Sequence, residues 1–159
     1  MKKWWITVAA TLALAAPALA QDQDLSKYVE LLRSDLRAQK TAIMAGVLQL
    51  SEQEDAKFWP IYREYEAELA KVNDDRIANI KDYADHFDQL TDEVADRLML
   101  RGMEIQGRRA ALVGTYYNKL KAALPAKTAA RVIQVEHQIL LILDLQIAAS
   151  LPIVKGDAK

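Results

Sequence analysis

Apolar residues along the chain recur at steps of three and four, the spacing that places them on one face of an α-helix. Four such stretches predict helices near residues 26–49, 51–88, 91–123 and 126–150, with turns at Leu50-Ser51, Asp88–Thr91 and Leu124-Pro125. No strands are expected. The predicted fold class is all-α, with four helices, two of them long, in an antiparallel arrangement.

Each predicted helix carries an apolar stripe that should face the core. The fourth helix is apolar nearly all round between Ile139 and Leu143, so this part should be buried or should meet a partner. In chain order, the stripes are Leu25, Tyr28, Leu32, Leu36, Ile43, Val47 and Leu50; Phe58, Tyr62, Tyr65, Leu69 and Val72; Val94, Leu98, Ile105, Leu112, Tyr116 and Leu120; and Val132, Ile133, Ile139, Leu140, Leu143 and Ile147.

Local signals mark where the helices begin. Ser51-Glu52-Gln53-Glu54 is a capping box, in which serine and glutamate side chains satisfy each other's backbone N–H groups. Thr91 is an expected N-cap, and Pro125 suits a first helical turn. Pro60 lies inside the second helix, where its missing N–H should cause a bend. Three glycines of the third helix are expected to allow close approach of a neighbouring helix: Gly102, Gly107 and Gly114.

The first 20 residues have a different pattern. Lys2 and Lys3 precede an apolar run from Trp4 to Ala16, and Ala18-Leu19-Ala20 forms a cleavage site. This order predicts a cleavable signal peptide at 1–20, followed by a single helical domain at 21–159. The mature protein is expected to be soluble in the periplasm, without stable membrane insertion, because no later segment is expected to be long enough to span a bilayer.

Composition excludes several classes of protein. The 159 residues contain no cysteine, which rules out disulfides, thiolate metal sites and a lipoprotein anchor. The formal net charge of −1 argues against nucleic-acid binding. There is no phosphate-binding glycine loop and no recognisable nucleophile motif, so neither an enzymatic activity nor a cofactor is expected.

Two short segments resemble a known family. Leu50-Ser51-Glu52-Gln53-Glu54 and Leu124-Pro125-Ala126-Lys127-Thr128 are similar to the two L-T-x-x-Q boxes of the Spy/CpxP family of periplasmic stress proteins. Serine and glutamate replace threonine and glutamine in the first box, and proline and threonine replace them in the second. The resemblance implies a cradle-shaped antiparallel homodimer. In the Spy branch it implies ATP-independent binding of unfolded clients, whereas other members sense envelope stress or bind metal ions.

Helix length independently favours a homodimer, because such long helices are not expected to bury all their stripes in a compact monomer. The leading functional hypothesis is a periplasmic ATP-independent chaperone or envelope-stress protein that binds exposed apolar segments of unfolded or envelope proteins. A metal-binding or metal-sensing protein and a structural helical adaptor are the alternatives.

Candidate site residues lie on the second and third helices. Trp59 combines contact area with a polar tip, and arginine engages both carboxylates and aromatic rings. Trp59 could equally pack in a dimer interface. Asp82 and His86, four residues apart, are weak metal-ligand candidates, and a solvated helix end is the alternative. The predicted client-binding surface consists of Trp59, Arg63, Glu66, Arg101, Arg108 and Lys119.

Overall fold

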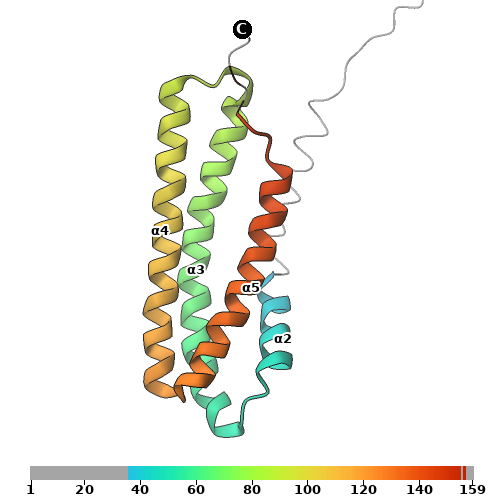
Figure 1. Ribbon diagram of the computed structural model, residues 1–159, viewed down its shortest axis with the longest axis vertical. Coiled ribbons are helices and arrows are strands. Elements are labelled where there is room, and N and C mark those ends of the chain that lie inside the picture. The colour runs from blue at the N-terminus through green and yellow to red at the C-terminus, as the bar shows by residue number, and fades with distance from the viewer. Residues whose placement is uncertain (1–35, 155, 157–159) are drawn as a thin grey trace, which may run out of the picture.

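The computed structural model describes residues 36–154 and 156, and shows an elongated helical bundle (Figure 1). A short 3₁₀ turn, η1 (Phe87–Gln89), follows the second of the helices. No strand occurs in the described residues, so the all-α prediction is confirmed. The signal peptide and the start of the first predicted helix lie outside the described residues. The helices are α2 (Leu36–Leu48), α3 (Glu52–His86), α4 (Asp92–Ala123) and α5 (Ala126–Ser150).

The long helices α3 and α4 form an antiparallel hairpin, and α5 returns beside them (Figure 1). The shorter α2 packs along the first half of α5. One end of the bundle, at the bottom of Figure 1, contains the α2–α3 and α4–α5 turns. The other, upper end contains the α3–α4 turn and the segment that follows α5.

The predicted helix starts are confirmed. The Ser51 side chain accepts a hydrogen bond from the Glu54 N–H, and the Glu54 carboxylate accepts from the Ser51 N–H, which completes the capping box. Thr91 caps α4 in the same way by accepting from Val94. Leu124 adopts an extended backbone, as the residue before a proline prefers, and Pro125 is the N-cap of α5. Pro60 is accommodated within α3, which is one helix throughout.

The core stripes of the three long helices are largely correct. Phe58, the most enclosed of them, belongs to a cluster that joins α3, α4 and α5 around the lower half of the bundle. Buried residues that the apolar spacing predicted are Phe58, Tyr62, Tyr65, Leu69, Val72, Leu98, Ile105, Tyr116, Leu120, Val132, Ile139, Leu140, Leu143 and Ile147. A single chain therefore buries these stripes, and the argument that a second copy is needed to cover them is wrong. The homodimer stays a prediction.

The stripe predicted for the first helix is wrong at Ile43 and Val47, whereas Leu50 packs against the core cluster as predicted, and the burial of its earlier members lies outside the described residues. Ile43 and Val47 are 43% and 49% exposed, whereas Lys40, Met44 and Leu48 are buried. Around the axis of α2, the buried face is therefore one residue away from the apolar face that carries Ile43 and Val47. Lys40 lies on this buried face, where Glu66 and Glu136 neutralise its charge.

The middle of α5 is only partly covered. Leu141, Ile142 and Leu145 are exposed on the outer side of the helix, although their neighbours are buried. Within the described residues, α5 has the length and apolar composition of a membrane span, and 33% of its most apolar window is buried. The expectation that no later segment is long enough is therefore wrong. Core helices of soluble proteins meet the same test, and α5 also carries two ion-paired carboxylates, Glu136 and Asp144.

The glycines of α4 only partly fulfil their predicted role. A Cβ added at Gly102 would lie 3.6 Å from the Asn79 side chain, so two helices do approach there. Gly107 and Gly114 have nothing within 4 Å of such an atom. For these two, the prediction of close approach is wrong within the described chain.

Gly107→Ala should stabilise the protein. Glycine in a helix interior costs about 0.5–1 kcal/mol relative to alanine, and the added methyl group at Gly107 enters open space. We expect urea denaturation to show an increase of that size in the free energy of unfolding. A decrease would mean that another surface packs against this glycine.

Candidate functional site

A buried cluster of charged groups joins α2, α3 and α5. The Lys40 ammonium lies 2.6 Å from a carboxylate oxygen of Glu136 and 2.6 Å from one of Glu66. Lys40 and Glu136 are each 1% exposed, which is rare for charged residues unless they are paired. Three helices therefore contribute one charged side chain each to a single interior site.

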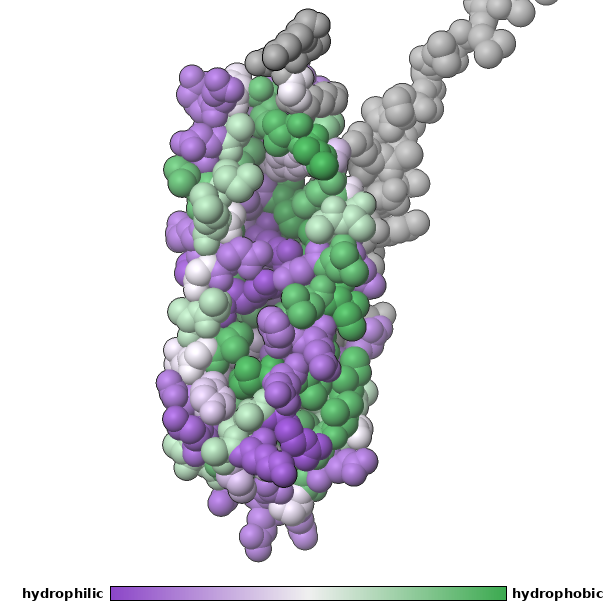
Figure 2. Space-filling view, in the orientation of Figure 1, coloured by the Kyte–Doolittle hydropathy of each residue, from purple (hydrophilic) through white to green (hydrophobic). Residues whose placement is uncertain are grey.

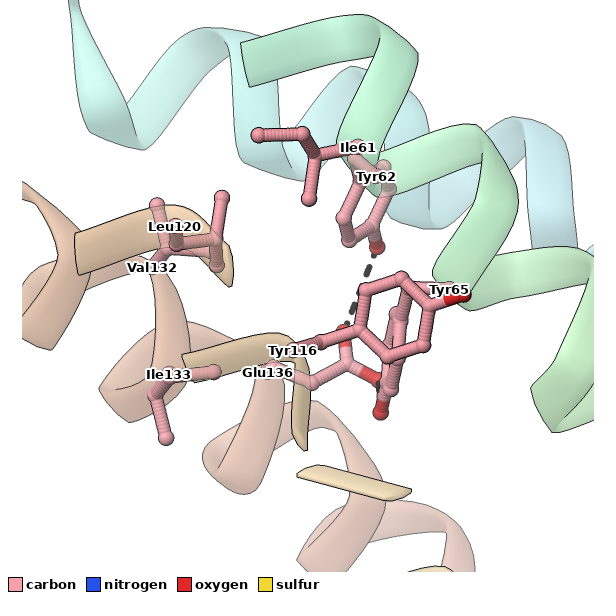
Figure 3. Close-up of a pocket in the computed structure, with 8 residues that line it drawn as sticks. All are labelled: Ile61, Tyr62, Tyr65, Tyr116, Leu120, Val132, Ile133 and Glu136. Carbon is pink, nitrogen blue, oxygen red and sulfur yellow. Dashed lines mark hydrogen bonds between the residues drawn. The ribbon is translucent and has the colours of Figure 1, made fainter. Parts of the chain in front are cut away.

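Two tyrosines complete this charge cluster, which we define as Lys40, Glu66, Glu136, Tyr62 and Tyr65. Both phenol groups donate to Glu136, at 3.2 Å from Tyr62 and 2.8 Å from Tyr65. Figure 3 shows the Glu136 carboxylate directed from α5 towards the tyrosines of α3. Burial, followed by the charge of Glu136, raises the pKa of both phenols, so they remain protonated donors. The Lys40 ammonium also lies 5.9 Å and 5.6 Å from the centroids of the two rings, a cation–π geometry.

The charge cluster contains two carboxylates and one cation. Separating a buried ion pair leaves an uncompensated charge, which costs several kcal/mol. Burial of the Glu136 carboxylate therefore requires Lys40 beside it. The space beside these groups, bordered by Ile61, Tyr116 and Ile133, has a volume of only about 10 Å³, so it offers no room for a substrate. The observed geometry supports a structural role and shows no reaction centre.

A second ion cluster ties the three long helices together. Arg109 of α4 donates to both oxygens of Asp144 on α5, at 2.9 and 2.5 Å, and Arg76 of α3 donates to Asp144 at 2.6 Å. Burial opposes ionisation of Asp144, but the hydrogen bonds from Arg109 and the charge of Arg76 hold its pKa below the usual value. Arg76 and Glu66 each stand in a run of charged residues, a pattern typical of a solvated face. Both residues instead face the interior.

The two family-like boxes meet in space. The Thr128 hydroxyl donates to the Glu54 carboxylate at 2.9 Å, and the same carboxylate accepts from Ser51. These hydrogen bonds, led by that from the Ser51 backbone, lower the pKa of Glu54. Leu50 and Leu124 pack in or against the core cluster. The boxes thus join the starts of α3 and α5, and this arrangement explains them as a structural feature.

The predicted client-binding residues do not form one surface. Lys119 pairs with Glu64 at 2.8 Å, and Arg108 pairs with Asp75 at 2.7 Å, along the α3–α4 seam. Glu66 instead faces Lys40 of α2. Glu64 and Glu66 are two residues apart, or roughly 200° around a helix. The basic residues of α4 and the Trp59–Arg63–Glu66 face therefore lie on opposite sides of α3.

Trp59 is partly buried and contributes to packing. Its indole N–H donates to Asp55 at 2.8 Å, and its ring contacts those of Phe58 and Tyr62 edge-on. Its neighbour Arg63 is exposed. Trp59 thus lies at the edge of the core cluster.

The weak metal candidates have protein partners. Arg97 donates to Asp82 at 2.6 Å, and this hydrogen bond holds the pKa of Asp82 below its usual value. Arg101 adds a smaller electrostatic contribution. His86 lies beside Asp82, with its Nδ1 atom 3.1 Å from a carboxylate oxygen. No group of three or more metal-ligating side chains occurs among the residues that the structure describes.

The upper end of the bundle contains an open apolar cavity, with a volume of about 380 Å³. Figure 2 shows a hollow in this part of the molecule with green, hydrophobic residues inside it and purple, hydrophilic residues below. The Tyr83 hydroxyl donates to the Pro152 carbonyl at 2.7 Å and holds the segment after α5 across this end. We call this feature the upper cavity. Its lining comprises Asn79, Ile80, Tyr83, Leu90, Ala95, Leu98, Met99, Gly102, Leu151, Pro152, Ile153 and Val154.

Two side chains with polar groups line the upper cavity, Tyr83 and Asn79. The Asn79 amide nitrogen donates to the Leu98 carbonyl at 3.2 Å. Its carbonyl oxygen is buried and has no hydrogen-bond partner among the described residues. A buried acceptor without a partner is unfavourable. The lining of the cavity is therefore mostly apolar, and one of its side chains carries an unsatisfied acceptor that is itself buried.

Comparisons with known proteins do not identify a family. No protein-family model, no curated protein and no solved structure matches the chain. The resemblance to Spy/CpxP proteins thus rests on the two boxes alone, and its functional implications stay proposals.

Sequence patterns missed both main features of this site. Lys40 and Glu136 are 96 residues apart, and each falls in a stretch where a charged residue is ordinarily solvated. The upper cavity depends on the path of residues 151–154 across α3 and α4. Only the apolar character of Leu151-Pro152-Ile153-Val154 could have indicated it.

Lys40→Met should be strongly destabilising. It leaves Glu136 buried beside Glu66 without a cation, so we expect a loss of about 3–5 kcal/mol in the free energy of unfolding, measured by urea denaturation. Lys71→Met is the matched control, because Lys71 pairs with Glu68 at the exposed surface and such pairs contribute about 0–1 kcal/mol. Equal effects of the two substitutions would contradict the assigned role of the charge cluster.

Proposed function

We propose that the protein is a periplasmic, ATP-independent chaperone or envelope-stress protein that binds exposed apolar segments of other proteins. The upper cavity is the observation that carries this proposal. It is open, mostly apolar and formed by residues outside the main core cluster. The signal-peptide pattern and the resemblance of the two boxes support the cellular setting.

The cavity has properties suited to varied apolar partners. Met99 is 61% exposed at its edge, and methionine side chains adapt readily to different shapes. Ile153 and Val154 present further apolar surface on the segment held by Tyr83. A short extended apolar segment of an unfolded protein fits this combination.

Client release needs no nucleotide in this arrangement. The cavity is open to solvent, so only part of a bound side chain would be removed from water. Ionised residues lie near its edge, including Asp82 and Arg97. Binding of moderate strength follows, which allows spontaneous dissociation. The alternative metal-binding function has less support, because Arg97 occupies the oxygens of Asp82.

Met99→Glu should weaken client binding. A charge at the edge of the upper cavity opposes burial of an apolar segment, and losing the contact of one methionine corresponds to about 1.5 kcal/mol, or roughly tenfold in affinity. We expect the concentration needed to suppress aggregation of an unfolded model protein to rise by about that factor. The readout is light scattering.

Met103→Glu is the matched control. Met103 lies four residues further along α4 and is 56% exposed, but it does not line the cavity. We expect its suppression of aggregation to equal that of the unchanged protein. Equal loss in both variants would contradict the cavity as the binding site. An unchanged protein that suppresses no aggregation would contradict the proposed function and favour a structural adaptor.

A further inference from the structure

Helix α2 is attached to the bundle through a small number of side chains. Between residues 39 and 48, the buried ones are Lys40, Met44 and Leu48, which follow one another at steps of four. Arg131 of α5 adds a hydrogen bond to the Val47 carbonyl at 3.0 Å. Between residues 39 and 48, the buried side chains of α2 thus lie on one helical face, and they include a charge that water can solvate when the helix leaves.

The connection between α2 and α3 is short and strained. It consists of Gln49, Leu50 and Ser51. Gln49 has a φ of 45°, in the left-handed region that side chains other than glycine occupy at a cost. Among the described residues, no other non-glycine residue has a positive φ. Short strained hinges favour the exchange of a terminal element between two copies.

The groove beneath α2 has a defined chemical preference. Its floor holds two carboxylates, Glu66 and Glu136, with the phenols of Tyr62 and Tyr65 directed at Glu136. Such a floor requires a cation from whichever helix lies over it. It also requires apolar side chains four and eight residues beyond that cation. The α2 helix of a second copy meets both requirements.

We propose that the protein forms a domain-swapped homodimer in which α2 of each copy lies in the α3–α5 groove of the other. Lys40 of the partner subunit then completes the charge cluster. Each groove keeps the same contacts, and Gln49 to Ser51 open so that α2 points away from its own α3. This inference concerns assembly and holds whether or not the upper cavity binds clients.

Release of the strain at Gln49 favours the swapped dimer over the closed monomer. Within one chain, a short connection gives α2 a local concentration in the millimolar range. Release of one left-handed residue per chain lowers the dissociation constant of the swapped dimer by about tenfold for each hinge. Two hinges bring the dimer into the range of about ten micromolar. The swapped dimer is therefore expected at protein concentrations above about ten micromolar.

Charge reversal in trans tests the exchange. The Lys40→Glu chain places a third carboxylate in its own groove, and the Glu136→Lys chain places two lysines in its own. Each alone should be monomeric and should melt at a lower temperature than the unchanged protein. In an equimolar mixture, exchange of α2 pairs Lys40 with Glu136 in one groove and the reversed charges in the other. We expect the mixture to form a dimer in sedimentation velocity and to recover part of the lost melting temperature, because one of its two grooves regains the native pair.

A cis variant that carries both substitutions is the control for the reversed pair. It should melt below the unchanged protein, because Glu66 then faces a second carboxylate, and its melting temperature is the reference for the reversed groove. A mixture that stays monomeric and melts as its separate components do overturns the proposal. Gln49→Gly tests it with the charge cluster intact, because glycine removes the hinge strain from the closed chain. We expect this substitution to raise the dimer dissociation constant about tenfold for each hinge. An unchanged constant, or an unchanged protein that is monomeric at a hundred micromolar, overturns the proposal as well.

Discussion

The contact between Lys40 and Glu136 determines how the rest of this bundle is arranged. Glu136 lies inside the protein because a cation and two phenol groups meet it there. The same contact sets which face of α2 is buried, because the Lys40 ammonium must point inwards. Ile43 and Val47 are left at the surface as a consequence. One ion pair between residues far apart in sequence thus orients a helix whose apolar spacing favours a different face.

Polar and apolar features divide the bundle along its length. The lower half has a continuous apolar core around the charge cluster, and the Asp144 cluster lies further along α5. Beyond it, the helices enclose the upper cavity, which the segment after α5 crosses. Specific buried ion pairs hold the helices in register, since apolar contacts alone tolerate many small displacements. The open apolar end is thereby held on a rigid frame, which suits a site for transient contacts with other proteins.

Local sequence signals predicted the fold well and the site poorly, for one physical reason. The capping box at Ser51, the cap at Thr91 and the proline at 125 act within a few residues, so their effects are readable without the structure. The stripe from Phe58 to Val72 is likewise a local repeat. The burial of Lys40 and Glu66 depends on partners up to 96 residues away, and no local pattern distinguishes them from solvated charges. For this reason Glu66 was assigned to an outer surface, whereas its carboxylate meets Lys40.

A double-mutant cycle on Lys40→Met and Glu136→Gln measures this central contact most directly. The four free energies of unfolding, obtained by urea denaturation, give the coupling between the two side chains without the cost of either substitution by itself. Two charges 2.6 Å apart in the interior should be coupled by about 2 kcal/mol or more. Additive effects, within about 0.5 kcal/mol, would contradict the claim that this ion pair organises the bundle.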